Sequence, residues 1–250
     1  MHASDYSATR PLVVLHQGHS RWYPPLLAAS LSLDLPLFVY PSQVGPALEA
    51  ALRGLWPLGF RAAAIEDPGL QALALDLVAH LEAEAAQARR VDLVVPEPSG
   101  TRGFYQEALA LAQLIRRYAL GDQALWLGPL RPELALGLRG LGKVSLMAQS
   151  FAQGESFLRL LPSPQQGVVA VSLAQAAGVA RQADLILYLG GSLPLGLLQP
   201  YHRLIALSPL PAEALRQIGE YVPPEEFQRF HLSALLEPLG YALPPEAFTL

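Results

Sequence analysis

The chain has 250 residues, of which 52% are hydrophobic and 15% are charged, and its net charge is −4 at pH 7 with an isoelectric point near 5.9. This length and apolar content suit one large domain or two of ordinary size, and the acidic balance excludes the basic surface that nucleic acid requires. Cysteine is absent, so disulfides and thiolate chemistry are excluded as well.

Prolines and glycines interrupt every apolar run, and none reaches the roughly 20 residues that a membrane helix needs. The first ten residues, "MHASDYSATR", are polar and contain no apolar signal region. We therefore expect a cytoplasmic protein, monomeric or homodimeric, with neither membrane nor nucleic acid as a partner. Lys143 is the only lysine, so lysine-based chemistry has a single candidate position.

In the first half of the chain, short apolar runs alternate with helical patterns. Strands are predicted over residues 11–17, 36–40, 60–65 and 91–95, and helices over residues 24–33, 44–55, 70–87 and 104–120. The last of these helices carries Arg116 and Arg117 in its final turns, where positive charge suits the helix dipole.

The second half repeats the alternation. Strands are predicted over residues 124–128, 143–147, 167–172, 183–190 and 202–208, and helices over 132–139, 151–160, 173–181 and 211–219. A further helix is expected from residue 223, and the last ten residues are expected to be extended. Buried strands that alternate with helices indicate parallel sheets covered on both faces, so we predict two α/β domains with a cleft between them.

Several short motifs occur in the order in which shikimate dehydrogenases show them. The family's His-Ser turn, its Leu-Asp with a later Tyr, its Val-x-Pro-x-Leu helix start and its x-Gly-Phe helix end correspond to "HQGHSRWYPPLLAAS", "LSLDLPLFVY", "VGPALEAAL" and "PLGF". Gly103-Phe104 matches the Gly-Phe that opens the family's connecting helix. The chain thus resembles shikimate dehydrogenase in element order from Leu12 to Leu210.

The resemblance implies an N-terminal, substrate-binding α/β domain over residues 1–102 and a Rossmann-like, doubly wound parallel-sheet domain over residues 103–222, with a C-terminal helix in about 223–250 packing back on the first domain. It also implies an NADP-dependent oxidoreductase of aromatic amino acid biosynthesis, acting on 3-dehydroshikimate and shikimate. The substrate-binding positions that it implies for a small anionic ligand are His19, Ser20, Asp92, Thr101 and Arg102, and the cofactor-binding positions are Gly128, Gly190 and Gly191.

The residues that carry the family's chemistry are absent. The family lysine of Asn-Val-Thr-x-Pro-His-Lys corresponds to Leu70 in "AIEDPGL", and the aspartate of Asn-Thr-Asp corresponds to Gly100 or Arg102, depending on how the shortened loop is aligned. Ketone reduction needs a proton donor within hydrogen-bond reach of the oxygen. We therefore predict that the chain has no catalytic residues for the family reaction.

The dinucleotide loop also departs from the family pattern. Where the family has Gly-Ala-Gly-Gly, this chain has Gly128-Pro129-Leu130-Arg131-Pro132, and the two prolines lack the N–H groups that a phosphate uses. Gln149 stands where an arginine commonly meets the 2′-phosphate, and Glu133 would repel a phosphate. We expect no cofactor, or NADP if the family reaction is retained. The alternative is a non-catalytic module that binds a small ligand or a protein on the same fold.

Other polar residues leave alternatives open. His16 and His19 lack a recognisable third ligand, so we expect no metal, and a histidine satisfied by a turn competes with a polar lining at the strand end. A solvated loop is favoured over an acid–base pair for Glu66 and Asp67. Arg102 is either a carboxylate clamp or a surface arginine. Three aromatic residues are expected in the core or at an interface: Tyr40, Tyr105 and Trp126.

Overall fold

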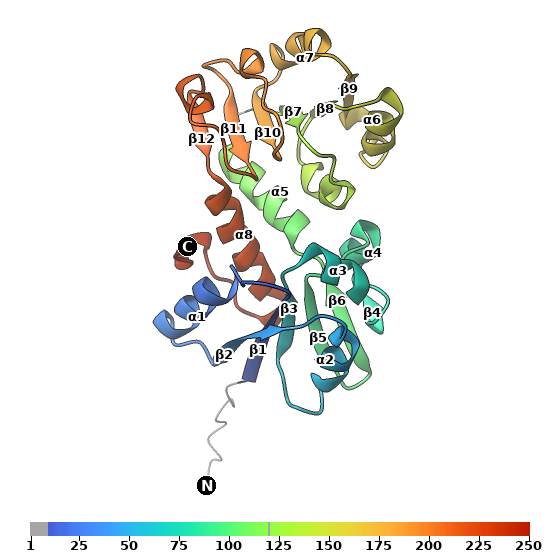
Figure 1. Ribbon diagram of the computed structural model, residues 1–250, viewed down its shortest axis with the longest axis vertical. Coiled ribbons are helices and arrows are strands. Elements are labelled where there is room, and N and C mark those ends of the chain that lie inside the picture. The colour runs from blue at the N-terminus through green and yellow to red at the C-terminus, as the bar shows by residue number, and fades with distance from the viewer. Residues whose placement is uncertain (1–9, 120) are drawn as a thin grey trace. The chain divides into compact units, whose positions relative to one another are not determined.

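The computed structural model describes residues 10–119 and 121–250, and the chain divides into two compact units, each with a six-stranded sheet (Figure 1). Unit 1 comprises the chain up to Glu107 together with His231–Leu250, and unit 2 comprises Ala108–Phe230. Two helices cross the boundary between the units. They are α5 (Glu107–Tyr118) and α8 (Pro224–Leu236).

The sheet of unit 1 has the order β2-β1-β3-β5-β6-β4. Its strands are β1 (Arg10–His16), β2 (Leu37–Gln43), β3 (Ala62–Ile65), β4 (His80–Leu81), β5 (Leu93–Glu97) and β6 (Gly100–Phe104). Its helices are α1 (Tyr23–Ser32), α2 (Leu48–Gly54), α3 (Pro68–Ala74) and α4 (Ala83–Ala88). Strand β5 runs antiparallel to both β3 and β6, so the expectation of a wholly parallel sheet is wrong for this unit.

The C-terminal part of the chain belongs to the core of unit 1. Leu232, Leu235 and Leu236 of α8 are buried against strand residues such as Leu12 and Val14. Each leucine that is fully withdrawn from water contributes roughly 1.5–3 kcal/mol. The second half of α8 is therefore part of the hydrophobic core that holds unit 1 together.

The sheet of unit 2 is parallel throughout and has the order β12-β11-β10-β7-β8-β9. Its strands are β7 (Gln123–Leu127), β8 (Lys143–Met147), β9 (Gln166–Ala170), β10 (Leu185–Tyr188), β11 (Arg203–Ala206) and β12 (Glu220–Val222). Counted within the unit, this order is 3-2-1-4-5-6, the arrangement of a dinucleotide-binding Rossmann sheet. The predicted α/β fold with a Rossmann-like domain is confirmed.

Short helices complete the two units. The α-helices of unit 2 are α6 (Phe151–Leu158) and α7 (Leu173–Ala180), and the 3-10 helices of the chain are η1 (Pro132–Leu138), η2 (Ser163–Gln165), η3 (Leu195–Leu197), η4 (Ala214–Arg216), η5 (Glu237–Leu239) and η6 (Pro245–Ala247). None of the helices in the described residues is both long and apolar enough to cross a bilayer.

The predicted helix over residues 70–87 is wrong, because β4 separates α3 from α4. Strand β4 pairs with β6, and Gly103 makes room for it: a Cβ at Gly103 would lie 3.1 Å from Val78 Cγ2 and 3.2 Å from Leu81 Cδ2. Tertiary pairing thus overrides a local helical pattern.

Gly103-Phe104 does not open the connecting helix. Both residues lie in β6, which forms an antiparallel hairpin with β5, and α5 begins three residues after Phe104, at Glu107. The apolar residues of this segment fit a buried strand as well as a helix, and only pairing with β5 separates the two interpretations.

Two other predicted helices are shorter and tighter than expected. Within the helix predicted over residues 132–139, the structure has the 3-10 helix η1 (Pro132–Leu138). This helix packs closely: a Cβ at Gly137 would lie 2.6 Å from the carbonyl oxygen of Ala108. Residues 211–219 contain only the single turn η4, followed by the unpredicted strand β12. The last ten residues, predicted as extended, include η6.

Candidate functional site

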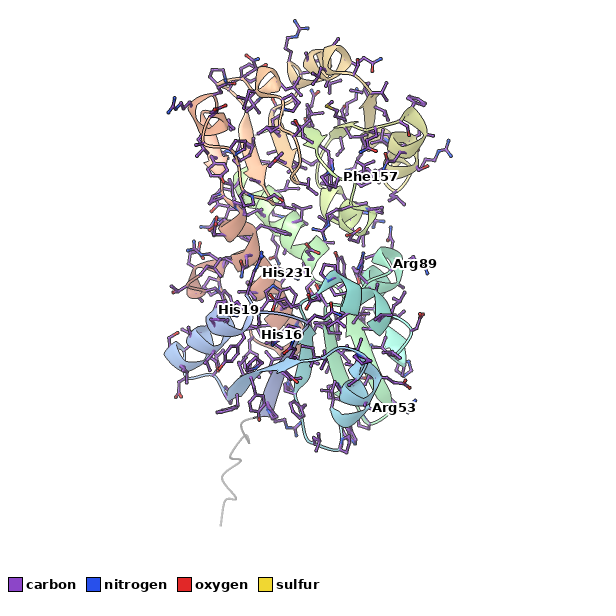
Figure 2. All side chains as sticks on the ribbon, viewed as in Figure 1. His16, His19, Arg53, Arg89, Phe157 and His231 are labelled. Carbon is purple, nitrogen blue, oxygen red and sulfur yellow. The ribbon has the colours of Figure 1, made fainter. Side chains whose placement is uncertain are left out.

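The carboxyl ends of β1 and β3 carry the first group of polar residues, as expected for ligand-binding edges of α/β sheets. Because β5 is antiparallel to β3, its start lies at this same edge. We call the set Ser20, Glu66, Asp92, Gln106 and His231 the unit 1 edge. Figure 2 labels His231 together with His16 and His19 in this part of the chain.

Glu66 holds the loop between β1 and α1. Its carboxylate accepts hydrogen bonds from the Ser20 hydroxyl at 2.6 Å and from the Arg21 N–H at 2.7 Å, with Trp22 N at 3.5 Å. Asp67 Oδ2 accepts from the Gln17 N–H at 2.7 Å. Glu66 and Asp67 lie partly exposed in the loop after β3, as the solvated-loop interpretation expected, and their carboxylates also anchor the loop between β1 and α1.

Asp92 lies in the interior and has no exposed surface. Its oxygens accept from the Gln106 N–H at 2.8 and 2.9 Å and from the Glu107 N–H at 3.0 Å, which places the carboxylate at the positive end of α5. Burial raises the pKa of the Asp92 carboxyl, and hydrogen bonds from His231 and Gln106 act against that rise. Asp92, predicted to bind substrate, is buried here and caps a helix.

His231 completes this buried cluster. Its Nε2 lies 2.9 Å from Asp92 Oδ2, and its ring meets Trp22 edge-on at a centroid distance of 4.8 Å. Since a carboxylate accepts, Nε2 carries the proton. Sequence analysis missed His231 because it is separated from Asp92 by 139 positions, and its only signal was a histidine in an otherwise apolar stretch of helix.

The start of α5 supplies a second carboxylate. Glu107 is buried, and Tyr105 donates its hydroxyl hydrogen to Glu107 Oε2 at 2.8 Å. Because Gly103-Phe104 lies in a strand, the acidic residue at the start of the connecting helix is Glu107. Gly100 and Arg102, predicted to occupy the position of the family aspartate, lie in β6 instead.

Thr101 and Arg102 do not join the unit 1 edge. The guanidinium of Arg102 binds Glu97 at 2.8 and 3.2 Å and Glu82 at 2.7 Å, and these carboxylates raise its pKa. The Thr101 hydroxyl accepts from the Ala79 N–H at 3.2 Å. The hairpin directs both residues toward its tip, because β6 runs back along β5. Arg102 is thus a paired surface arginine rather than a free clamp.

The two histidines near β1 differ. His16 is buried and its Nδ1 lies 2.7 Å from the Gly18 carbonyl oxygen, so it is satisfied by a turn. His19 is exposed in the following loop. In the ranges 10–119 and 121–250, no three potential metal-ligating side chains come together.

Leu70 has no exposed surface and lies in α3, just after the carboxyl end of β3. The position that resembles the family lysine is therefore filled by a core side chain. Of the three aromatic residues expected in the core or at an interface, Tyr105 and Trp126 are buried, and Tyr40 is partly exposed on β2.

In unit 2, three glycines meet where β7 and β10 lie side by side, the point at which the strand order reverses. Gly128, Gly190 and Gly191 have φ values of 113°, 111° and 81°. A Cβ on Gly128 would lie 2.6 Å from the Gly190 carbonyl oxygen. Glycine is therefore required at 128 by a close backbone approach within the protein.

The residues around this point do not fit a dinucleotide in the usual mode. The Pro129 carbonyl accepts from Trp126 Nε1 at 3.1 Å, and Arg131 is paired with Glu133 at 3.0 Å. The α-helix whose free N–H groups hold a pyrophosphate is replaced by η1, which has Pro132 in its first turn. After β8, Gln149 offers no positive charge to a 2′-phosphate.

No protein-family model matches the chain, and no curated protein matches its sequence. Solved structures match the fold. Shikimate dehydrogenase from Mycobacterium tuberculosis is 19% identical with a TM-score of 0.76, over 95% of this chain and 97% of that chain. Shikimate 5-dehydrogenase from Listeria monocytogenes, solved with shikimate and NAD, is 12% identical with a TM-score of 0.78, over 95% and 93%. Ligand-free 5-ketofructose reductase from a Gluconobacter strain is 14% identical with a TM-score of 0.77, over 95% of each chain.

At these identities the likeness concerns the fold, and it agrees with the order of motifs along the sequence. The chain therefore has the shikimate dehydrogenase fold over nearly its whole length.

Proposed function

We propose that this chain is a distant member of the shikimate dehydrogenase family that has lost the dehydrogenase reaction and binds a small anionic ligand without transforming it. The observation that carries the proposal is Leu70, a fully buried hydrocarbon side chain where the family has an ammonium group. The only lysine of the chain, Lys143, begins β8 in unit 2 and belongs to a different sheet.

The hydrogen bonds of the unit 1 edge support this proposal. Glu66 and Asp92 already accept hydrogen bonds from the backbone, and breaking those of Asp92 would leave buried N–H groups without an acceptor. The exposed side chains in the loop after β1 include Gln17, His19 and Arg21. We assign the His19 imidazole and the Arg21 guanidinium, whose N–H groups can donate to an anion, to the anionic ligand.

The unit 2 edge supports the absence of a dinucleotide. Gly128 packs against Gly190, the loop after β7 contains Pro129 and Pro132, and the charge of Arg131 is paired with that of Glu133. We therefore expect no saturable binding of NADP or NAD.

The decisive test is an assay of the purified chain with shikimate and NADP. We expect no increase in NADPH absorbance, whereas an authentic shikimate dehydrogenase under the same conditions gives one. A robust increase would overturn the proposal. A thermal-shift screen of cyclic carboxylates then tests ligand binding, because a ligand that binds only the folded state raises Tm. His19→Ala and Arg21→Ala should abolish that rise, and Arg53→Ala, an exposed arginine of α2, should not.

One observation favours a second candidate, an oxidoreductase that has replaced the missing lysine. The Asp92–His231 pair, with Glu107 nearby in the sequence, contains the residue types that hold and release protons. If NADPH-dependent reduction of shikimate-like ketones is detected, His231→Asn should lower kcat about 100-fold or more, the range of general acid–base catalysis. His80→Asn, at an exposed histidine, is the matched control.

A further inference from the structure

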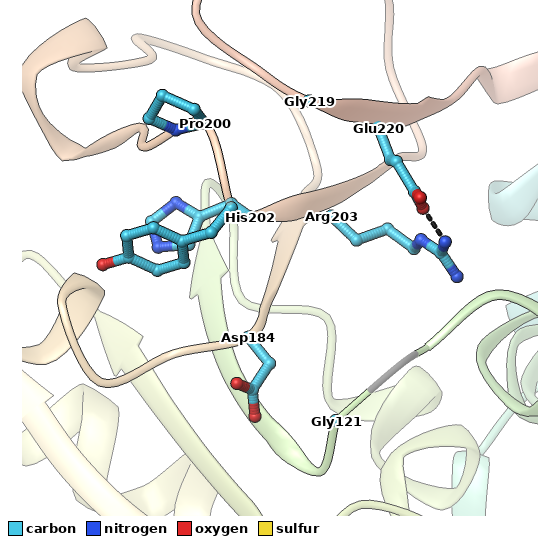
Figure 3. Close-up of a pocket in the computed structure, with 8 residues that line it drawn as sticks. Gly121, Asp184, Pro200, His202, Arg203, Gly219 and Glu220 are labelled. Atoms are coloured by element: carbon cyan, nitrogen blue, oxygen red, sulfur yellow. Dashed lines mark ion pairs between the residues drawn. The ribbon is translucent and has the colours of Figure 1, made fainter.

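A cavity of about 450 Å³ lies in unit 2 and is lined by none of the residues assigned to the sites above (Figure 3). Its lining residues lie at or just before the amino ends of β7, β10, β11 and β12, which are neighbours in the sheet. Its lining residues are Gly121, Asp184, Pro200, Tyr201, His202, Arg203, Gly219 and Glu220. Ligands of α/β sheets usually occupy the opposite, carboxyl edge, so this cavity is separate from the dinucleotide position of the fold.

The cavity depends on two glycines. A Cβ at Gly121 would collide with the Asp184 carboxylate, and a Cβ at Gly219 would collide with the Pro200 carbonyl oxygen. Neither glycine has a positive φ, so space rather than backbone conformation requires them. The absence of side chains at these two positions leaves room for the Asp184 carboxylate and for the loop that carries Pro200.

The positive charge in the lining is paired, although the Nε of Arg203 is buried without a hydrogen-bond partner among the described residues. Arg203 forms an ion pair with Glu220 and donates to the Tyr118 carbonyl oxygen. His202 accepts from the Gln199 N–H at Nδ1 and lies 2.8 Å from the Ala180 carbonyl oxygen at Nε2, which defines a neutral imidazole with its proton on Nε2. Burial lowers the pKa of His202, in agreement with the neutral form.

Asp184 is therefore the unbalanced charge. Asp184 is exposed, and its carboxylate accepts a long hydrogen bond, at 3.4 Å, from the Gln123 N–H. Asp184 and Glu220 with Arg203 give the lining a net charge of −1. Figure 3 shows the Asp184 carboxylate and the Arg203–Glu220 pair on different sides of the pocket.

An aromatic ring completes the lining. Tyr201 is 59% exposed, its hydroxyl donates to the Arg181 carbonyl oxygen at 3.3 Å, and its ring meets His202 edge-on at 4.7 Å. These contacts orient the ring, and an exposed aromatic face attracts organic cations. Since the described residues hold no cluster of three metal ligands, the lining suits an ammonium group better than a metal ion.

We propose that this cavity binds a small aliphatic amine, whose ammonium group is held by the Asp184 carboxylate and the face of Tyr201. A second ammonium group on a diamine would reach toward Glu220, which is half-exposed. The site is independent of the function proposed above, because it shares no residue with the unit 1 edge.

The test is an NMR titration of the full chain with putrescine, using 1,4-butanediol as a neutral analogue. We expect saturable shifts of the Gly121, Asp184 and Gly219 amide signals with putrescine and none with the diol. Asp184→Asn should weaken the affinity about tenfold, the effect of one charge-assisted hydrogen bond. Asp122→Asn, at an exposed aspartate outside the lining, should leave it unchanged.

Absence of saturation with putrescine, equal shifts with the diol, or an unchanged affinity in Asp184→Asn would each overturn the proposal. Saturation of the same amides by inorganic phosphate would overturn it too, because it would indicate an anion site at Arg203. If Asp184→Asn does not fold, Tyr201→Leu is the second variant. It should weaken putrescine binding about threefold through loss of the aromatic face, and an unchanged affinity would contradict the site.

Discussion

The carboxyl edges of the two sheets occupy comparable places in their units and differ in chemistry. The unit 1 edge contains the partly exposed Glu66 and the buried Asp92, whose carboxylates accept hydrogen bonds from backbone N–H groups and, at Asp92, from a histidine. The corresponding edge of unit 2 is built from glycines and prolines, and the charges of Arg131 and Glu133 there neutralise each other. Polar residues at the first edge thus stabilise the fold, whereas the second edge is held by close backbone packing.

This difference separates the position of a residue from its role. In unit 1, Asp92, at a position expected to contact a substrate, caps a helix. In unit 2, Gly128, at a position expected to contact a cofactor, packs against the Gly190 backbone. A residue type found at a family position therefore does not establish the family role.

The largest loss of unfolding free energy is expected from Asp92→Ala. Removing this buried carboxylate leaves His231 and the Gln106 and Glu107 N–H groups without their acceptor, at a cost of about 3–5 kcal/mol of unfolding free energy. Urea denaturation measures the loss, and Asp76→Ala, at an exposed aspartate of unit 1, is the control. A loss no larger than that of the control would show that the edge does not depend on Asp92.

The second test concerns the glycine contact in unit 2. Gly128→Ala should cost about 2–3 kcal/mol, because alanine is strained at φ 113° and its Cβ meets the Gly190 backbone. Gly178→Ala in α7 should instead stabilise the protein by about 0.5–1 kcal/mol, since open space surrounds that position. Equal effects in thermal denaturation would contradict the role assigned to Gly128.

A smaller effect is expected from Glu66→Ala. The Ser20 hydroxyl and the Arg21 N–H would lose their acceptor, at a cost of about 1–2 kcal/mol. Glu49→Ala removes an exposed ion pair with Arg53 and should cost less than about 0.5 kcal/mol. Denaturant midpoints that coincide for the two variants would show that Glu66 does not anchor the loop.

The smallest expected effect is a change, with pH, in the contribution of Asp92 to the unfolding free energy. Burial raises the Asp92 pKa above its ordinary value of 3.8, so the folded state binds this proton more tightly than the unfolded state. The stability gained from protonation of Asp92 is therefore fully present below pH 3.8 and is lost as pH rises through the higher folded pKa. The difference in unfolding free energy between wild type and Asp92→Asn should change with pH in that sense, and a pH-independent difference would refute it.

Much of the fold was predictable because strand and helix periods are local. All five strands predicted in the second half of the chain occur, and residues 143–147 match β8 at both ends. Strand β4 was missed because it is two residues long and pairs with a strand more than 20 positions away, and β6 was missed because its apolar residues were assigned to the connecting helix. The same lack of pairing information led to the prediction of one long helix over residues 70–87.

The candidate site was less predictable. The sequence placed Ser20 and Asp92 at strand ends, and they lie at one edge, but Thr101 and Arg102 are carried away from it by the hairpin. The sequence did not predict that Glu66 anchors the loop after β1, because its hydrogen-bond donors, Ser20 and Arg21, are more than 40 positions away. Hydrogen bonds between such distant positions leave no periodic signal.

By itself, the sequence determined the α/β class, the Rossmann-like second sheet and the absence of lysine from the position that Leu70 occupies, since composition and periodicity act locally. Only the tertiary structure decided that Asp92 is a buried cap bound to His231, that Gly128 faces Gly190, and that Asp184 borders a cavity. Each of these contacts joins residues from separate elements, and their distances follow from how the sheets are assembled rather than from the order of residues.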